Sequence, residues 1–409
     1  MRVLIVHNHY QSAGGEDAVV RAEISLLRAK GNDVELLQVD NDNIVGKLEA
    51  AKAALQCAYS LTGARLMHDR IRQFRPDLVH VHNFFPRLSP SVHYVCRQAR
   101  VPIVQTLHNY RLLCPAFTLS RGATPCDDCL GKIVPWPAIQ HSCYRHSKTG
   151  SAVVATMLSI HRMLKTWDHT VARFVALTAF ARGKFIEGGL PAGKIMVKPN
   201  FLGVDPGPGA GDGGYALYVG RLSPEKGIDT LLASWQQLPT KRALKIMGDG
   251  PLGSVVRSAA STINGIEWLG PAGREEVSRA MAHATVLILP SVYYEGFPMV
   301  IVEALAAGLP IIASRLGSMA ELVEQGVTGL LFPPGSPNHL ARAADWAFTH
   351  PDRLIDLRQC ARREFVKKYT AETNYVFISE IYESALRSVR VNQESSASFG
   401  ASNAAHQEY

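Results

Sequence analysis

The feature that most constrains this chain is an alternation of strand and helix patterns that runs twice, on either side of a segment rich in Gly and Pro (203–214). Such alternation is typical of α/β domains built on parallel sheets. We therefore predict two doubly wound domains that face a cleft. The expected strands are 2–8, 33–40, 77–83, 102–108, 173–178 and 194–199 in the first series, and 215–220, 243–248, 265–270, 285–290, 310–314 and 329–333 in the second.

The same pattern suggests the domain limits. We expect a first domain over 1–203, a second over 204–370, and a last helix over 371–390 that could return to the first domain. Residues 391–409 are rich in Ser, Ala, Asn and Gln, and we expect them to be disordered. In open parallel sheets ligands bind beyond the carboxyl ends of the strands, so functional residues are sought in the loops that follow them.

Charge and cysteine content narrow the class of protein. The 409 residues include 43 Lys and Arg against 35 Asp and Glu, a formal net charge of +8. This excess suits a nucleotide, a nucleic acid or a membrane surface without choosing among them. No apolar run reaches the ~18 residues of a membrane span, and the N-terminus reads as a strand, not a signal peptide. Seven cysteines are not the pattern of a disulfide-stapled secreted scaffold, so we expect a cytoplasmic protein.

The first constellation of interest follows the expected strand 215–220. Ser223 is a good helix N-cap, which places Lys226 in a first helical turn, where a cation opposes the helix dipole. A bound diphosphate would remove this conflict, because Arg221, Lys226 and the helix N-terminus would all face the same anion. The alternative is a solvated Lys226 whose charge is offset by Glu225.

A second constellation follows the expected strand 285–290. Glu295 lies in a loop, and Glu303 lies in the helix after it, among apolar residues. A carboxylate in such surroundings needs a partner, because unpaired buried charge is costly. The amides of Met299 and Val300 would point from the helix N-terminus toward an anion. One interpretation is that a sugar nucleotide binds here, with Glu303 accepting hydrogen bonds from the ribose hydroxyls and Glu295 from hydroxyls of the transferred sugar. The other is an internal salt bridge for Glu303 and a plain surface loop for Glu295.

These motifs resemble one family. Glu295 and Glu303, separated by seven residues within Glu-Gly-Phe-Pro-Met-Val-Ile-Val-Glu, resemble the signature of retaining GT-B nucleotide-sugar glycosyltransferases of family four, also called group 1. Gly220-Arg221 with Lys226, the segment 248–251, and Gly14-Gly15 are similar to its other markers. The resemblance covers about residues 1–390. It implies two Rossmann-like domains, the first on the acceptor side and the second binding the nucleotide sugar.

The resemblance also implies roles for individual residues. The implied catalytic residues are His108, Arg221, Lys226 and Glu295, and the implied donor-binding residues are Gly14, Gly15, Gly220, Gly248, Gly296, Phe297, Met299, Val300 and Glu303. Taken alone, the Gly14-Gly15 pair reads as a tight turn between strand and helix, and His108 as a structural residue at a strand end. No metal or cofactor is expected in catalysis, and Asp40-Asn-Asp42 is expected to be a loop and helix cap.

The implied reaction moves a sugar from a nucleoside diphosphate to an acceptor hydroxyl with retention of configuration. We expect a glycan or lipid-linked glycan acceptor, in cell-envelope or exopolysaccharide synthesis. The basic amphipathic stretch 149–167 could touch an anionic membrane at the inner face of the plasma membrane; domain packing is its other interpretation. The alternatives are a sugar-nucleotide epimerase on the same fold and a non-catalytic binding protein. No nucleic-acid partner is expected, because the basic residues are dispersed.

The segment 110–147 departs from the plain family pattern. It holds Cys114, Cys126, Cys129 and Cys143, and Cys126-Asp-Asp-Cys129 has the spacing of a chelating pair. One hypothesis is a structural zinc lobe beside the acceptor side of the cleft, in which His141 or His146 could take the place of a cysteine ligand. The alternatives are reduced cysteines without a ligand and, less in keeping with the cytoplasm, a disulfide.

Overall fold

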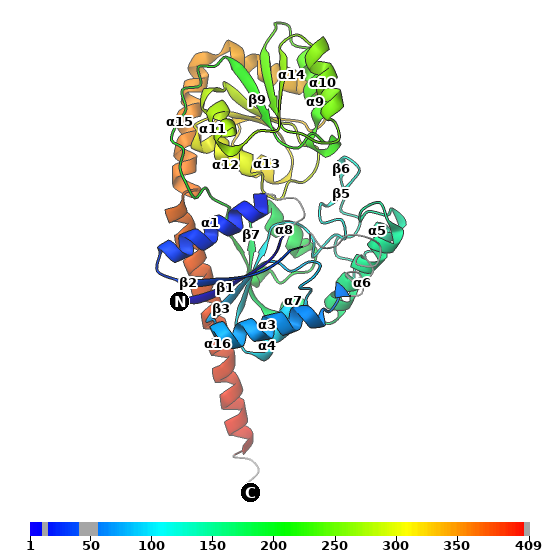
Figure 1. Ribbon diagram of the computed structural model, residues 1–409, viewed down its shortest axis with the longest axis vertical. Helices are drawn as coiled ribbons and strands as arrows, with labels where there is room; N and C mark the ends of the chain where they lie inside the picture. The colour runs from blue at the N-terminus through cyan, green and yellow to red at the C-terminus, as the bar shows by residue number, and fades with distance from the viewer. Residues whose placement is uncertain (10–14, 41–55, 405–409) are drawn as a thin grey trace.

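The computed structural model describes residues 1–9, 15–40 and 56–404, with side chains up to residue 388. Its core is a pair of parallel six-stranded sheets (Figure 1). The first has the order β2-β1-β3-β4-β7-β8 and the second β11-β10-β9-β12-β13-β14, which confirms the predicted pair of doubly wound α/β domains. The first sheet comprises β1 (Arg2–His9), β2 (Asp33–Asp40), β3 (Leu78–Asn83), β4 (Ile103–Leu107), β7 (Val171–Ala176) and β8 (Ile195–Val197). The second comprises β9 (Tyr215–Val219), β10 (Ala243–Met247), β11 (Ile266–Gly270), β12 (Val286–Leu289), β13 (Ile311–Ser314) and β14 (Gly329–Phe332).

Helices cover both faces of each sheet, and this explains the continuous apolar runs of the strands. In β1, Val3 and Ile5 pack on one side and Leu4 and Val6 on the other, and all four are fully buried. The first domain carries α1 (Gly15–Ala29), α3 (Leu61–Phe74), α4 (Ser91–Gln98), α5 (Trp136–Gln140), α6 (Lys148–Met163), α7 (Thr166–Thr170) and α8 (Ala179–Glu187). The second carries α9 (Ile228–Gln236), α10 (Gly253–Thr262), α11 (Arg274–His283), α12 (Met299–Ala306), α13 (Gly317–Leu322), α14 (Pro337–Thr349) and α15 (Pro351–Lys368).

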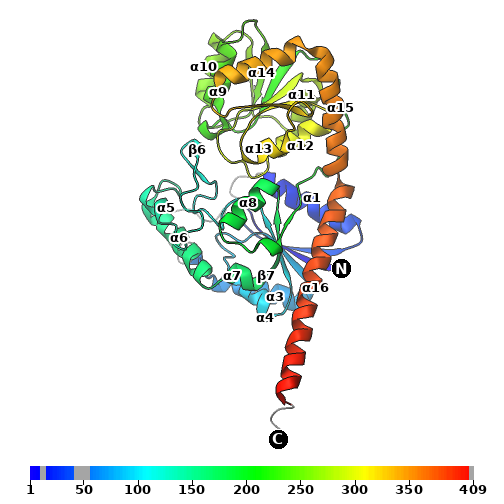
Figure 2. The same cartoon turned by 180° about the vertical axis from the view of Figure 1, so that it is seen from behind.

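The last helix, α16 (Ala371–Ala404), leaves the second domain and lies along the first (Figures 1 and 2). Its residues Ile378, Ile381 and Tyr382 are buried against β1 and its neighbours. The structure continues α16 over 391–404, part of the stretch for which disorder was expected. Residues 405–409 lie outside the described residues.

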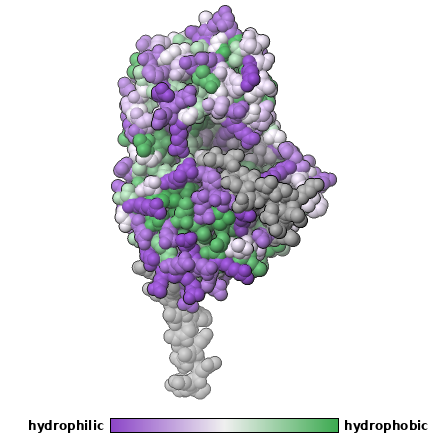
Figure 3. All heavy atoms as spheres, viewed as in Figure 1, coloured by the Kyte–Doolittle hydropathy of each residue, from purple (hydrophilic) through white to green (hydrophobic). Residues whose placement is uncertain are grey.

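The carboxyl ends of the strands of both sheets face the boundary between the domains, and the space-filling view shows the surface hollowed there (Figure 3). Contacts across this boundary fix the two domains to each other. The carboxylate of Glu321 on α13 accepts hydrogen bonds from the Ala179 and Phe180 amides at the start of α8, at 2.8 and 2.7 Å. The hydroxyls of Thr178 and Ser318 share a hydrogen bond of 3.0 Å. The loops after the strands are therefore held at one place.

Candidate active site

The second domain joins two of the predicted catalytic residues in an ion pair. Lys226 follows β9 and Glu295 follows β12, and the Lys226 Nζ lies 2.7 Å from the Glu295 Oε1. The Lys226 side chain is 22% exposed and that of Glu295 only 6%. A carboxylate buried to this degree fixes the position of the ammonium group.

The turn that carries Lys226 differs from the expected helix start. Pro224–Lys226 form a single 3₁₀ turn, Gly227 adopts φ 72°, and α9 begins only at Ile228. Ser223 occupies the N-cap position of this turn, as expected, but its hydroxyl makes no capping hydrogen bond and donates to the Glu225 Oε1 at 2.6 Å. The turn swings Lys226 toward β12 rather than along the axis of α9.

Glycines allow the strand ends of the second domain to lie in direct contact. A Cβ on Gly227 would lie 1.9 Å from the Pro290 carbonyl oxygen, and one on Gly248 1.9 Å from the carbonyl oxygen of Gly220. Any side chain at these two positions would push apart β9, β10 and β12. Gly220 and Gly248, both predicted to bind donor, therefore also have a packing role.

Glu295 has further hydrogen-bond donors that the sequence analysis missed. Its Oε1 also accepts from the Ser291 hydroxyl and its Oε2 from the Tyr293 hydroxyl, both at 2.7 Å. Burial would raise the pKa of Glu295, but Lys226 and these hydroxyls outweigh it and leave the pKa lowered. Ser291, Tyr293 and Glu295 are spaced by two residues, a spacing that places side chains on one side of an extended segment and could have indicated the cluster.

Two other predicted residues of this domain have no partner of their own. Arg221 is exposed, and Glu303 on α12 is partly buried; the described part of the chain offers neither side chain a hydrogen bond or an ion pair. Burial raises the pKa of Glu303, and the distant positive charge of Arg274 only partly opposes this. The internal salt bridge considered for Glu303 is therefore not formed within the described residues.

The remaining predicted donor-binding residues surround the start of α12. Gly15 faces it from α1, where an added Cβ would lie 3.7 Å from the Met299 Cγ. A Cβ on Gly296 would lie 2.7 Å from the His108 carbonyl oxygen, so this glycine lets the two domains meet. Phe297 and Val300 are partly buried against the core of the second domain. Gly14 and Asp42 lie outside the described residues.

In the first domain, His108 is linked to a buried charged network. Its Nε2 shares a hydrogen bond of 2.8 Å with the His82 Nδ1. The His82 Nε2 lies 3.2 Å and the His80 Nδ1 3.0 Å from the Glu23 Oε1. The Lys198 Nζ lies 3.0 Å from the Glu23 Oε2. Sequence reasoning read His80 as a packing residue and left His82 undecided; both belong to this network.

Burial in this network keeps His82 and His108 neutral near pH 7. Burial is the main reason that the pKa of His82 falls to about 3, and the nearby His80 lowers it further against the pull of Glu23. Burial also holds the pKa of His108 well below its usual value. Burial would raise the pKa of Glu23, but Lys198, then His80 and His82, bring it well below its usual value.

Two groups of residues have metal-ligand chemistry. Glu23, His80 and His82 bring three ligating atoms within 4.8 Å of one another. However, Lys198 already neutralises Glu23, and both ring nitrogens of His80 have hydrogen-bond partners in Tyr382 and Thr106. This group is therefore an ion-pair network rather than a vacant metal site.

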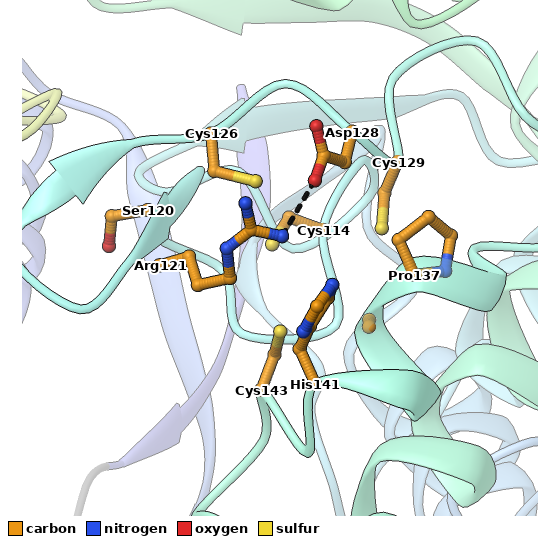
Figure 4. Close-up of a pocket in the computed structure, with 10 residues that line it drawn as sticks. Cys114, Ser120, Arg121, Cys126, Asp128, Cys129, Pro137, His141 and Cys143 are labelled. Atoms are coloured by element: carbon orange, nitrogen blue, oxygen red, sulfur yellow. Dashed lines mark hydrogen bonds and ion pairs between the residues drawn. The ribbon is translucent and has the colours of Figure 1, made fainter.

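The second group lies in the segment 110–147, where Cys114, Cys126, Cys129 and Cys143 line one small pocket (Figure 4). All four are free thiols. Burial, and then the proximity of the other three thiols, raise the pKa of Cys129 to about 11. The four cysteines that the sequence analysis singled out therefore line the same pocket.

One face of α6, which makes up most of the stretch 149–167, packs into the first domain. Val154, Met157 and Leu158 on this helix are buried in the main core of the first domain. The helix is therefore a packing element along its apolar face. Across the part of the chain that the structure describes, no helix combines the length and apolarity of a membrane span.

Comparison with known proteins agrees with this architecture. A model of the glycosyl transferase 4-like domain matches residues 14–200, and a model of the glycosyl transferases group 1 matches residues 213–350. These two matches take in most of both domains. The chain belongs to the group 1 glycosyltransferases, with the GT-B fold.

Individual relatives are distant. An uncharacterized glycosyltransferase of Methanocaldococcus jannaschii is 31% identical over 175 residues, which are 42% of this chain and about half (49%) of that protein. Phosphatidyl-myo-inositol mannosyltransferase of Mycobacterium leprae is 25% identical over 404 residues, covering 95% of this chain and 98% of that one. Among solved structures, Anabaena HepE in complex with UDP aligns with a TM-score of 0.63 at 19% identity, over 94% of this chain and all (100%) of that chain. These structural likenesses show the fold.

Proposed function

We propose that this protein transfers a sugar from a nucleoside diphosphate sugar to an acceptor hydroxyl with retention of the anomeric configuration. The observation that carries the proposal is the Lys226–Glu295 pair, which fixes a cation where the ends of β9 and β12 meet. Arg221 follows β9 and Glu303 lies on α12, the helix after β12, and within the described residues neither side chain has a hydrogen-bond or ion-pair partner. HepE, which has the same fold, is solved with UDP, and this supports a diphosphate ligand.

In this proposal the negative charge that develops on the leaving diphosphate is stabilised by Lys226, Arg221 and the amides at the start of α12. Fixed donors in such positions are the usual source of electrostatic catalysis. No metal ion is required for this task, and turnover that persists in EDTA would support that part of the proposal. Glu303 accepts hydrogen bonds from the ribose hydroxyls, which replace the partner that it otherwise lacks.

Glu295 has two roles in the proposal. A carboxylate offers about four lone-pair positions, and Lys226, Ser291 and Tyr293 use three of them. The position left on the Oε2 accepts a hydroxyl of the transferred sugar. Glu295 therefore holds the catalytic cation and contacts the sugar at once.

His108 contacts the sugar from the first domain, and His82 and Glu23 position it. The Glu23 carboxylate favours a proton on the His82 Nε2, so the His82 Nδ1 accepts from the His108 Nε2–H. This assignment leaves the His108 Nδ1 as an acceptor for a sugar hydroxyl. A neutral His108 is the form required, and burial maintains it.

For the acceptor, we propose a glycan or lipid-linked glycan of the cell envelope, met at an anionic membrane surface. The support is an exposed apolar group: Ile133, Val134 and Trp136 are 59, 47 and 57% exposed, and Met163 and Leu164 are 63 and 59% exposed. Arg162 donates to the Lys132 carbonyl, which brings the two segments together. Apolar side chains next to Lys132 and Lys165 suit a membrane interface. Sedimentation with anionic vesicles, lost in Trp136→Ala, is the expected result.

A thermal-shift panel of UDP-, GDP- and ADP-sugars tests the donor site. A ligand that binds only the folded protein stabilises it by about 2.7 kcal/mol at a hundred times its dissociation constant. We expect one nucleotide to shift the wild type and Glu324→Ala, an exposed control on the same domain, and to leave Glu303→Ala unchanged. An equal shift of Glu303→Ala, or no shift of well-folded wild type by any donor, would contradict the proposed site. The anomeric configuration of the product, read by NMR, tests retention.

A further inference from the structure

Four of the cysteines converge although they are spread along the chain. Cys114 lies in the turns after β4, Cys126 and Cys129 follow β6 (Thr124–Pro125), and Cys143 follows α5. Together with Asp128 they line the pocket of Figure 4, in which their thiols point inward from three separate turns. The other three cysteines lie elsewhere in the fold, Cys360 on α15 among them.

The segment around the pocket has little regular structure to hold these turns. Between residues 110 and 147 it contains the two-residue strands β5 (Ser120–Arg121) and β6, and the five-residue helix α5. Left-handed backbone recurs at non-glycine positions, as at Phe117 (φ 61°) and Ser142 (φ 52°). Such conformations persist where the surroundings impose them. A bond at the centre of the turns would supply that constraint.

A guanidinium group is held beside the thiols. Arg162 donates hydrogen bonds of 2.9 and 2.8 Å to the carbonyls of Leu112 and Leu113, directly before Cys114 in the chain. Four thiolates around a divalent cation carry a net charge of about −2, which this guanidinium group partly balances.

We propose that Cys114, Cys126, Cys129 and Cys143 bind one structural zinc ion in a tetrahedral site. Four thiols release four protons and form four Zn–S bonds, with no change of oxidation state. Zinc is the ion that all-thiolate tetrahedral sites without redox chemistry most commonly hold. In the structure, no three of these sulfur atoms all lie within 4.8 Å of one another. Zinc binding would therefore draw the four thiols closer together. Arg121, which lies among them in Figure 4, moves toward solvent, where its side chain is already 47% exposed.

The zinc site would fix one wall of the boundary between the domains. Asp127, between the chelating Cys126 and Cys129, forms an ion pair of 2.8 Å with Lys184 on α8. The segment starts two residues after His108, and its strands β5 and β6 reach toward the second domain in both views (Figures 1 and 2). The exposed Ile133, Val134 and Trp136 lie on the loop that Cys129 and Cys143 close. Zinc would thereby hold the acceptor side in shape without entering the reaction.

Metal analysis of the full chain, purified without chelators, tests the proposal. We expect about one zinc per chain in the wild type and in Cys360→Ser, and less than about 0.1 in Cys126→Ser. Cobalt in place of zinc should give the visible absorption of a tetrahedral thiolate site in the wild type. Thiol-specific mercurial reagent should release zinc from the folded protein. These readouts are independent of activity.

Other outcomes would overturn the proposal. They are stoichiometric iron in place of zinc, a disulfide between two of the four cysteines, or a folded, reduced protein that takes up no zinc under anaerobic conditions. Arg121→Ala distinguishes a zinc site from the remaining possibility, which is that the Arg121 side chain itself fills the pocket. If the pocket is a metal site, Arg121→Ala keeps its zinc and its melting temperature. Loss of thermal stability without any zinc in the wild type would assign the pocket to the Arg121–Asp128 pair instead.

Discussion

The two domains build their halves of the site in opposite ways. In the second domain, Lys226 and Glu295 form a partly exposed ion pair supported by hydroxyls two and four residues away along the chain. In the first, His108 depends on a fully buried chain of groups drawn from α1, β3, the end of β8 and α16. One half is assembled by a local loop and the other by tertiary contacts. Mutations should therefore affect the second mainly through rate and the first mainly through stability.

The largest effect should follow the loss of the Glu23 charge. Glu23→Gln leaves the ammonium group of Lys198, whose side chain is 1% exposed, without its counterion. Breaking a buried pair in this way typically costs about 3–5 kcal/mol of stability. Urea denaturation should show this loss, and Glu23→Gln with Lys198→Met should recover much of it.

A surface pair on the same sheet provides the control. Glu35 and Arg70 also form an ion pair, at 3.0 Å, with side chains 39 and 38% exposed. Glu35→Gln should change stability by less than about 1 kcal/mol. Equal effects of the two substitutions would contradict the view that the first domain depends on a buried network.

The next largest effect should be on catalysis in the second domain. Lys226→Ala removes the cation that we place beside the leaving diphosphate. The activation barrier should therefore rise by about 3 kcal/mol, and turnover should fall a hundredfold or more. The protein should remain folded, as measured by circular dichroism. Lys241→Ala, an exposed lysine of the same domain, should turn over normally. Near-normal turnover of Lys226→Ala would remove Lys226 from the proposed mechanism.

The contrast between a half-site built by a local loop and one built by tertiary contacts explains how much of the site the sequence could predict. The strands of the two parallel sheets were predicted to within two residues, because each is a short apolar run closed by Gly, Pro or a polar residue, whereas the two-residue strands β5 and β6 were not predicted. Lys226 and Glu295 were found from loops next to strand ends, since parallel topology brings such loops together. The network of Glu23, His82 and Lys198 could not be found this way. Its members lie 59 and 116 residues apart along the chain, and no local pattern marks their contact.

The segment after β9 was predicted in part. Ser223 and Pro224 together are a sound signal for a helix start. The structure has Ser223 at the N-cap and Lys226 in the first turn, as expected, but this turn is a 3₁₀ turn, and Gly227 at φ 72° separates it from α9. Sequence reasoning thus placed Lys226 correctly and missed the break before α9.

A smaller effect should follow removal of one hydroxyl beside Glu295. Tyr293→Phe deletes the hydrogen bond to the Glu295 Oε2 and leaves the Lys226 contact in place. A hydrogen bond to a charged group is worth about 2 kcal/mol. We expect turnover to fall less than in Lys226→Ala, with donor KM little changed. A loss as large as that of Lys226→Ala would show that the carboxylate is positioned mainly by Tyr293.

A change of pH should separate the two domains. In the first domain, His93 is buried with its Nε2 2.9 Å from the Gln105 Oε1, and burial lowers its pKa to about 4. His283, His339 and His350 of the second domain are exposed. Between pH 6.5 and 4 the unfolded chain binds a proton at His93 that the folded chain does not. Stability therefore falls as the pH falls, by up to about 1.4 kcal/mol per pH unit for such a histidine.

Hydrogen exchange can follow this difference within one molecule. Amides of β3 and β4 should lose protection between pH 6.5 and 5, after correction for intrinsic exchange, whereas amides of β9 and β12 should not. His93→Gln should reduce the loss in the first domain and leave the second unchanged. The pKa values of His82 and His108 are also lowered, and these two histidines should account for the loss of protection that remains in His93→Gln. Equal pH dependence in both sheets would mean that the domains unfold as one unit, and the stability of the donor half of the site would then depend on histidines of the acceptor half.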